Sequence, residues 1–173
     1  MSAELVADVT KAIRDIPDFP KPGILFKDIT PVLSDAALFK RVIDWMGEHT
    51  GGADVIVGME SRGFIFGAPL VAVTGAGFVP ARKPGKLPYQ SVGVDYALEY
   101  GTARLEMHVD AVKAGDKVVV VDDLLATGGT AAATIKLIRE LGAEVVGCVF
   151  LVELDFLGGA EKLDVPVHSL VHY

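Results

Sequence analysis

The apolar residues of this chain recur at two spacings, and each spacing predicts a different element. In residues 2–16, Leu5, Val9, Ile13 and Ile16 stand three or four positions apart, which predicts an amphipathic helix because such side chains share one helical face. Similar spacing predicts further helices. Their expected ranges are 35–49, 63–73 and 131–141, with a short helical piece around Glu161 and Lys162.

Short apolar runs lie between these helices, and they are better interpreted as strands. The clearest is four consecutive valines at residues 118–121. Continuous β-branched residues suit strands that are buried on both faces of a parallel sheet. Since helices and strands alternate through the centre of the chain, we expect an α/β fold with a doubly wound, mostly parallel sheet flanked by helices. The other expected strands are 54–58, 78–81, 144–154 and 167–171.

Two segments interrupt this alternation. Prolines at positions 17, 20 and 22 make residues 18–23 an extended connector, and residues 24–30 then form a short strand-like arm. Residues 82–94 hold three cations, two prolines and two glycines without periodicity. This composition fits equally a lid that closes over an anion and a mobile, solvated loop. Residues 96–107 alternate apolar and polar positions around Gly101, so we expect strands that frame this loop.

The length of 173 residues is most simply one domain. Within it we expect a small N-terminal hood, formed by the helix and arm of residues 1–34. We also expect a flexible lid loop with flanking strands over residues 82–107.

Charge and cysteine content narrow the class of function. Sixteen Lys and Arg residues against 23 Asp and Glu residues give a net charge of −7, which argues against a broad nucleic-acid-binding surface. Cys148 is the only cysteine, so an intramolecular disulfide and a cysteine metal cluster are excluded. The longest uncharged run, residues 63–81, contains glycines and prolines that favour a helix, a turn and a strand over a membrane span. With no stretch resembling a signal peptide, we expect a cytoplasmic protein that does not enter membranes.

The most informative stretch is residues 117–130. Asp122 and Asp123 follow the valine strand, and a turn rich in glycine and threonine then precedes a helix. The N–H groups of such a turn and the helix dipole attract an anion, while the acids can accept from hydroxyls or hold a cation. The alternative is an ordinary turn with the acids as helix caps. Ser61 and Arg62 also follow a predicted strand, at the edge where open α/β sheets place ligands.

Other glycine and histidine signatures do not match. No G-x-x-x-x-G-K-[ST] string occurs, and Pro80 takes the place of the third glycine that a dinucleotide motif starting at Gly75 would need. The four histidines show no metal-ligand spacing, and no G-x-S-x-G nucleophile elbow is present.

The string VVVVDDLLATGGT resembles the phosphoribosyl diphosphate (PRPP) signature of the type I phosphoribosyltransferases. Further matching segments bring the similarity to nearly the full chain and favour the members that use adenine. The resemblance implies the type I phosphoribosyltransferase fold and a purine-salvage reaction in which the 5-phosphoribosyl group of PRPP passes to N9 of adenine, giving AMP and diphosphate. It also implies a requirement for Mg²⁺ and a homodimer. The matching segments are 19–23, 26–31, 60–64, 82–88 and 98–101.

The resemblance assigns the sugar-phosphate half of the site to the central stretch. Asp122 and Asp123 would accept hydrogen bonds from the ribose hydroxyls and lie near Mg²⁺, which would be held mainly through PRPP. A five-residue turn would wrap the 5′-phosphate with N–H groups and hydroxyls, and its glycines would permit close backbone approach. Its residues are Ala126, Thr127, Gly128, Gly129 and Thr130.

The resemblance assigns diphosphate to Ser61 and Arg62, and to Arg82, Lys83 and Lys86 as the lid closes. The lid cations could come partly from a second subunit. It also makes Glu60–Ser61 the candidate for a non-proline cis peptide bond. Arg62 and Lys83 would act catalytically by neutralising the leaving group.

For the base, the resemblance places adenine between Phe26 and Leu124, with backbone atoms of Leu25 and Lys27 reading its Watson–Crick edge. A carbonyl that accepts from N6–H₂ and an N–H that donates to N1 would disfavour hypoxanthine, which presents the opposite pattern. Glu99 would lie near N7 and is the candidate for a catalytic proton shuttle.

Two other functions stay open. One is transfer to another purine, such as hypoxanthine or xanthine, which the adenine-type segments at 26–28 and 98–100 disfavour. The other is a PRPP-sensing regulator that binds nucleic acid without catalysis, which the acidic composition disfavours.

Overall fold

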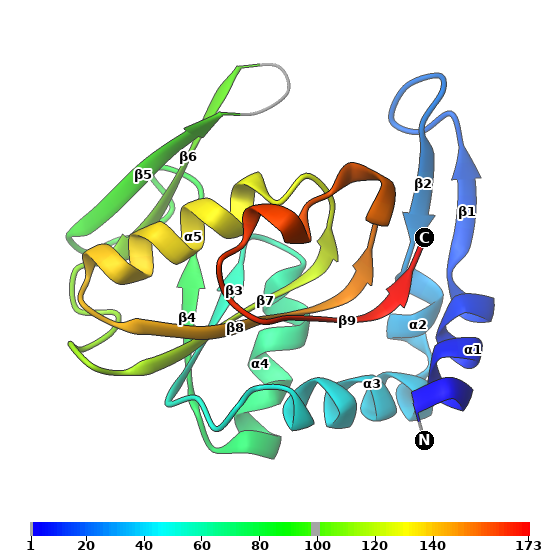
Figure 1. Ribbon diagram of the computed structural model, residues 1–173, viewed down its shortest axis with the longest axis horizontal. Helices are drawn as coiled ribbons and strands as arrows, with labels where there is room; N and C mark the ends of the chain where they lie inside the picture. Colours follow the sequence, from blue (N-terminus) through cyan, green and yellow to red (C-terminus); the bar gives the residue numbers. More distant parts are fainter. Residues whose placement is uncertain (1, 98–100) are drawn as a thin grey trace. The chain divides into compact units, whose positions relative to one another are not determined.

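The computed structural model describes residues 2–97 and 101–173, and the chain divides into two compact units, residues 1–45 and 46–173 (Figure 1). Among the described residues, no helix is long and apolar enough to cross a membrane.

The N-terminal unit combines helices with a small antiparallel sheet. Strands β1 and β2 pair so that Ile16 lies opposite Phe26. The elements are α1 (Ser2–Ala12), β1 (Arg14–Pro17), β2 (Leu25–Asp28), α2 (Thr30–Ser34) and α3 (Ala36–Glu48), which ends just past this unit.

Two predictions for this unit were wrong in detail. The first helix was expected to reach Ile16, but it ends at Ala12, and Ile16 belongs to β1. The reason is that β1 gains a hydrogen-bonded partner in β2, a contact ten residues away that helical spacing cannot reveal. Helix α2 was not predicted, because a proline next to the expected arm of residues 24–30 suits the end of a strand as well as the first turn of a helix, where Pro31 lies.

The second unit is built on a five-stranded sheet in the order β4-β3-β7-β8-β9, in which every neighbouring pair is parallel. This confirms the predicted parallel sheet. Its strands are β3 (Val55–Met59), β4 (Gly77–Ala81), β7 (Lys117–Leu125), β8 (Glu144–Glu153) and β9 (Val167–His172).

Helices cover the sheet as predicted. Helix α4 (Gly63–Thr74) connects β3 to β4, and α5 (Gly129–Glu140) connects β7 to β8. These two connections run in opposite directions along the sheet, so right-handed crossovers put the helices on opposite faces. In Figure 1, α5 lies above the sheet and α4 below it. Two short 3₁₀ turns, Asp155–Leu157 and Ala160–Lys162, follow β8, and the second matches the predicted helical piece.

The expected lid loop is shorter than predicted. Strand β5 begins at Ser91 and runs to Ala97, pairing antiparallel with β6 (Thr102–His108). Arg82 is also bridged to Glu106 through their main chains. The segment without strand pairing is therefore 83–90 rather than 82–94, because valines at 92 and 94 alternate in register with β6.

The centre of the sheet is fully apolar. The four valines of β7 are inaccessible to solvent, as are Phe150 and Cys148 of β8. Cys148 lies between Val120 and Val167 of the neighbouring strands. Burial raises the pKa of its thiol to about 12. Residues on both faces of these strands are buried, which explains why the runs are continuous rather than alternating.

Candidate functional site

The candidate site lies where the order of the sheet reverses. Strands β3 and β7 are neighbours, yet the chain leaves β3 toward one edge of the sheet and leaves β7 toward the other. In open α/β sheets the carboxyl ends of such a strand pair form the usual ligand crevice. The predicted diphosphate loop follows β3, and the predicted PRPP turn follows β7, so the fold brings these two segments to the same edge.

The two acids of the signature lie inside β7 and not after it, which corrects the predicted end of that strand. Asp123 is buried, with 3% of its surface exposed, and its Oδ2 lies 3.0 Å from Nη1 of Arg62. Its backbone N–H donates to Oδ1 of Asp122 at 2.8 Å. The structure therefore joins Arg62, expected at diphosphate, to an acid expected at ribose.

Burial makes ionisation of this acid pair costly. It raises the pKa of Asp122 to about 8, and the negative charge of Asp123 adds to this rise. Burial also raises the pKa of Asp123, although the Arg62 guanidinium opposes the rise. A cation or hydroxyl donors at this position would favour the ionised form.

Glycine allows α4 to begin directly against β7. A Cβ on Gly63 would lie 2.6 Å from the carbonyl oxygen of Val121 and 3.1 Å from Oδ1 of Asp122. Any side chain there would push Arg62 away from the acids.

The predicted phosphate turn forms one wall of a cavity of about 90 Å³ at the N-terminus of α5. Gly128 precedes the helix with φ 77°, a conformation that favours glycine. The orphan N–H groups at the start of α5 and its dipole suit an anion. The lining includes Asp122, Leu124, Ala126, Thr127, Gly128, Gly129 and Thr130.

A floor beneath this turn comes from a segment that sequence reasoning did not assign. A Cβ on Gly128 would overlap the carbonyl oxygen of Gly159, and a Cβ on Gly159 would overlap that of Ala126. Lys162 donates from Nζ to the carbonyl oxygen of Thr127 at 2.7 Å. The Gly158-Gly159 pair in the sequence was the available signal, but nothing local relates it to a turn thirty residues earlier.

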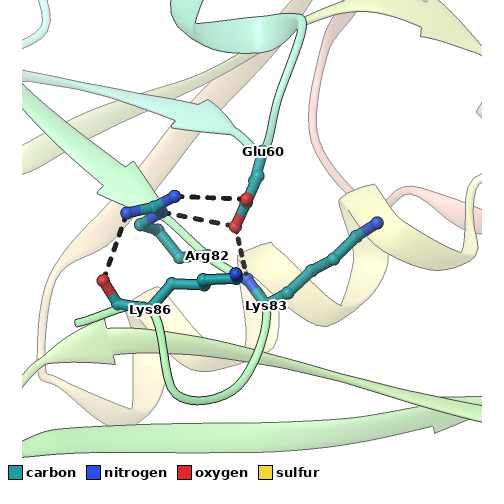
Figure 2. A network of polar contacts seen from close by, with 4 residues as sticks. All are labelled: Glu60, Arg82, Lys83 and Lys86. Atoms are coloured by element: carbon teal, nitrogen blue, oxygen red, sulfur yellow. Dashed lines mark hydrogen bonds and ion pairs between the residues drawn. The ribbon is translucent and has the colours of Figure 1, made fainter.

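The cations of the expected lid do not share one environment. Arg82 is paired with Glu60, whose Oε1 lies 3.2 Å from its Nη2, and it also donates to the carbonyl oxygen of Lys86 (Figure 2). Lys83 and Lys86 are exposed. The peptide bond between Glu60 and Ser61 is cis, as expected.

The residues expected at the base belong to different units. Leu25, Phe26 and Lys27 form most of β2, where Phe26 meets Phe19 edge to face at 5.1 Å between ring centroids and Lys27 pairs with Asp15 at 2.6 Å. Leu124 belongs to β7 of the other unit. Glu99 lies outside the described residues.

Comparison with known proteins decides the family. The sequence model of the phosphoribosyl transferase domain matches residues 31–167. The chain belongs to the phosphoribosyltransferase family. It is 59% identical over 161 residues to the adenine phosphoribosyltransferase of Myxococcus xanthus, covering 92% of this chain and 88% of the relative. It is 57% identical over 170 residues to that of Acetivibrio thermocellus, covering 96% and 99%.

Solved structures agree with this family in fold. Adenine phosphoribosyltransferase from Thermoanaerobacter pseudethanolicus superposes with a TM-score of 0.93 at 52% identity, covering 97% of this phosphoribosyltransferase and 99% of the other. The enzyme from Saccharomyces cerevisiae, complexed with adenine and an imino-altritol bisphosphate, also gives 0.93, at 42% identity, covering 97% and 99%.

Proposed function

We propose that this phosphoribosyltransferase transfers the 5-phosphoribosyl group of PRPP to N9 of adenine, giving AMP and diphosphate. The observation that carries the proposal is the phosphate turn at the N-terminus of α5, placed beside the acid pair Asp122–Asp123 at the switch point of the sheet. The relatives above, each named for adenine, support the choice of base.

The turn is suited to the 5′-phosphate. Its N–H groups at the start of α5 supply donors, and the hydroxyls of Thr127 and Thr130 add two more. The acids that follow the valines are suited to the ribose diol, since ionised carboxylates only accept hydrogen bonds. Anchoring both ends of the sugar phosphate would fix C1′ for attack.

The diphosphate end depends on cations. We propose that Ser61, Arg62, Lys83 and Lys86 neutralise the leaving group, because its charge grows as the bond to C1′ breaks. Arg62 already lies at the acid pair, 3.0 Å from Asp123, so one guanidinium can respond to both ribose and diphosphate.

The donor set also fits Mg²⁺. Carboxylate oxygens of Asp122 and Asp123 are ligands this ion accepts, and a site dominated by PRPP would suit its preference for substrate phosphates. Bound there, Mg²⁺ would supply charge neutralisation to the diphosphate.

The chemistry needs no covalent enzyme intermediate. N9 displaces diphosphate through a transition state with oxocarbenium character, and the protein contributes positioning, charge neutralisation and exclusion of water. Glu99 is the candidate that holds or moves a proton at N7. Base selection would rest on main-chain groups of Leu25 and Lys27, with Phe26 as an apolar neighbour of the base, and Leu124 of the other unit is a separate candidate for apolar contact with adenine.

Competition between bases tests the proposal. Purified protein with PRPP and Mg²⁺ should convert adenine to AMP at least tenfold more efficiently than hypoxanthine, guanine or xanthine, because a wrong base leaves buried polar groups unpaired. Equal or faster use of hypoxanthine would overturn the adenine assignment. A homodimer, a cytoplasmic location and one functional domain over residues 1–173 stay predictions.

A further inference from the structure

Glu60 lies between the diphosphate loop and the start of the expected lid, and its carboxylate accepts hydrogen bonds from three donors. Arg82 donates from Nη2 to Oε1 at 3.2 Å and from Nε to Oε2 at 3.3 Å, and the backbone N–H of Lys83 donates to Oε2 at 2.8 Å (Figure 2). Forked contact of this kind fixes orientation as well as distance. Burial opposes ionisation of Glu60, but the donors from Lys83 and Arg82 outweigh it and hold its pKa below the ordinary value.

The guanidinium of Arg82 donates its hydrogen bonds to groups of the protein itself. Its Nε and Nη2 engage Glu60, and Nη1 donates to the carbonyl oxygen of Lys86 at 3.1 Å. Its guanidinium also lies 5.9 Å from the centre of the Phe64 ring. The Lys83 side chain behaves differently, since Figure 2 shows it extending away from Glu60.

Main-chain contacts also hold together Glu60, the start of the lid loop and strand β6. The Glu60 N–H donates to the carbonyl oxygen of Ala81 at 2.9 Å, and Arg82 exchanges two backbone hydrogen bonds with Glu106. The Glu106 side chain accepts from the Gly85 N–H at 3.1 Å. The start of the lid loop is thus held against β6 and against the residue that precedes Ser61.

We propose that Glu60 and Arg82 form a positioning pair, which holds the diphosphate loop and the start of the lid loop in one arrangement so that Arg62 and Lys83 can bind diphosphate. This assignment rests on the proposed function. It revises the expectation for Arg82, which acts through Glu60 and the Lys86 carbonyl instead of binding diphosphate itself.

A double-mutant cycle tests the pair. Glu60→Gln, Arg82→Gln and the double variant are compared for PRPP KM, for diphosphate KM in the reverse reaction, and for AMP dissociation. Each single variant should raise both KM values by about 10- to 100-fold, the effect of losing a charged hydrogen bond. The KM values of the double variant should not exceed those of the more strongly impaired single variant, because both substitutions remove the same arrangement. AMP affinity should stay within about threefold in all of them.

Direct binding of diphosphate by Arg82 predicts different results. If Arg82 binds diphosphate directly, its loss will multiply with that of Glu60, and Arg82→Lys will keep most of the affinity because the charge remains. The positioning role predicts that Arg82→Lys fails like Arg82→Gln, since lysine lacks the fork. This comparison also decides the matter if Glu60→Gln does not fold.

Two controls separate the possible failures. Asp164→Asn removes the exposed carboxylate that pairs with Arg139 at 2.8 Å. Neither residue belongs to the lid loop, so this variant should leave every constant unchanged. Wild-type protein that makes no AMP would overturn the proposed function itself, whereas active wild-type protein with a multiplicative cycle would overturn only the positioning pair.

Discussion

Asp122 and Asp123 are neighbours in β7, yet they have different surroundings. Asp123 is buried against the Arg62 guanidinium, while Asp122 accepts a hydrogen bond from the Asp123 N–H. Because ionising both costs the buried pair electrostatic energy, the pKa values of both acids are raised and the unliganded site disfavours full ionisation of the pair. Substrate hydroxyls and Mg²⁺ would reverse that preference by stabilising the charged form.

Asp122→Asn should change how stability depends on pH. The folded pKa of about 8 lies above the ordinary value of 3.8, so the wild-type free energy of unfolding should fall as pH rises between these values. The slope is at most about 1.4 kcal/mol per pH unit. The variant should have a flatter profile and be more stable than wild type at pH 8, with weaker use of PRPP. Urea unfolding at pH 5 to 8 measures the slope of the free energy of unfolding against pH. The exposed control Asp110→Asn should keep the wild-type slope. An Asp122→Asn slope equal to that of wild type and the control would contradict the prediction.

At the scale of the element, the phosphate turn depends on a floor that follows β8. Gly159→Ala should displace Ala126, because the added methyl would overlap its carbonyl oxygen, and it would also lie only 3.1 Å from the nitrogen of Gly128. We expect PRPP KM to rise by about tenfold or more, the scale of losing one charged hydrogen bond, with the fold retained. Steady-state kinetics and circular dichroism check both parts.

Gly75→Ala is the matched control for that variant. Gly75 has φ 75° and open space around its Cβ position, so alanine should cost about 1–2 kcal/mol of stability without touching the turn. An unchanged PRPP KM in Gly159→Ala, or an equal rise in Gly75→Ala, would show that the floor does not shape the site.

Elements formed by contiguous residues could be predicted from the sequence, whereas contacts between distant segments could not. The valines of β7 and the turn after them are contiguous, so their order along the chain predicted both the strand and the anion site. The contacts of Gly159 and Lys162 with that turn are long-range, and no periodicity encodes them. The strand character of Ile16 was missed for a related reason, since its partner Phe26 is supplied by the arm.

At the scale of the whole molecule, alternation of helices and strands was enough to predict the parallel sheet, because each βαβ crossover is local. The pairing of Glu60 with Arg82 was not predictable, since it needs the register of β3 against β4. Charge was informative only as a total: a net charge of −7 argued against a broad basic surface, but the position of Arg62 beside Asp123 depends on the fold.

Ligand binding should be visible in the stability of the whole chain. PRPP at about 100 times its Kd, with Mg²⁺, should add about 2.7 kcal/mol to the free energy of unfolding. For a protein of this size that corresponds to a rise in Tm of about 5–10 °C. Removing Mg²⁺ with EDTA should abolish most of the shift; an undiminished shift in EDTA, measured by differential scanning fluorimetry, would argue against metal-assisted binding.

The burial of Cys148 has a practical consequence for the molecule. A thiol with a pKa of about 12 in the middle of β8 is almost entirely protonated and out of reach of alkylating reagents and oxidants. It reacts only after the central strands separate, so its modification rate reports how often the sheet opens. Cys148 is therefore a built-in probe of unfolding, and no other cysteine contributes to the modification signal.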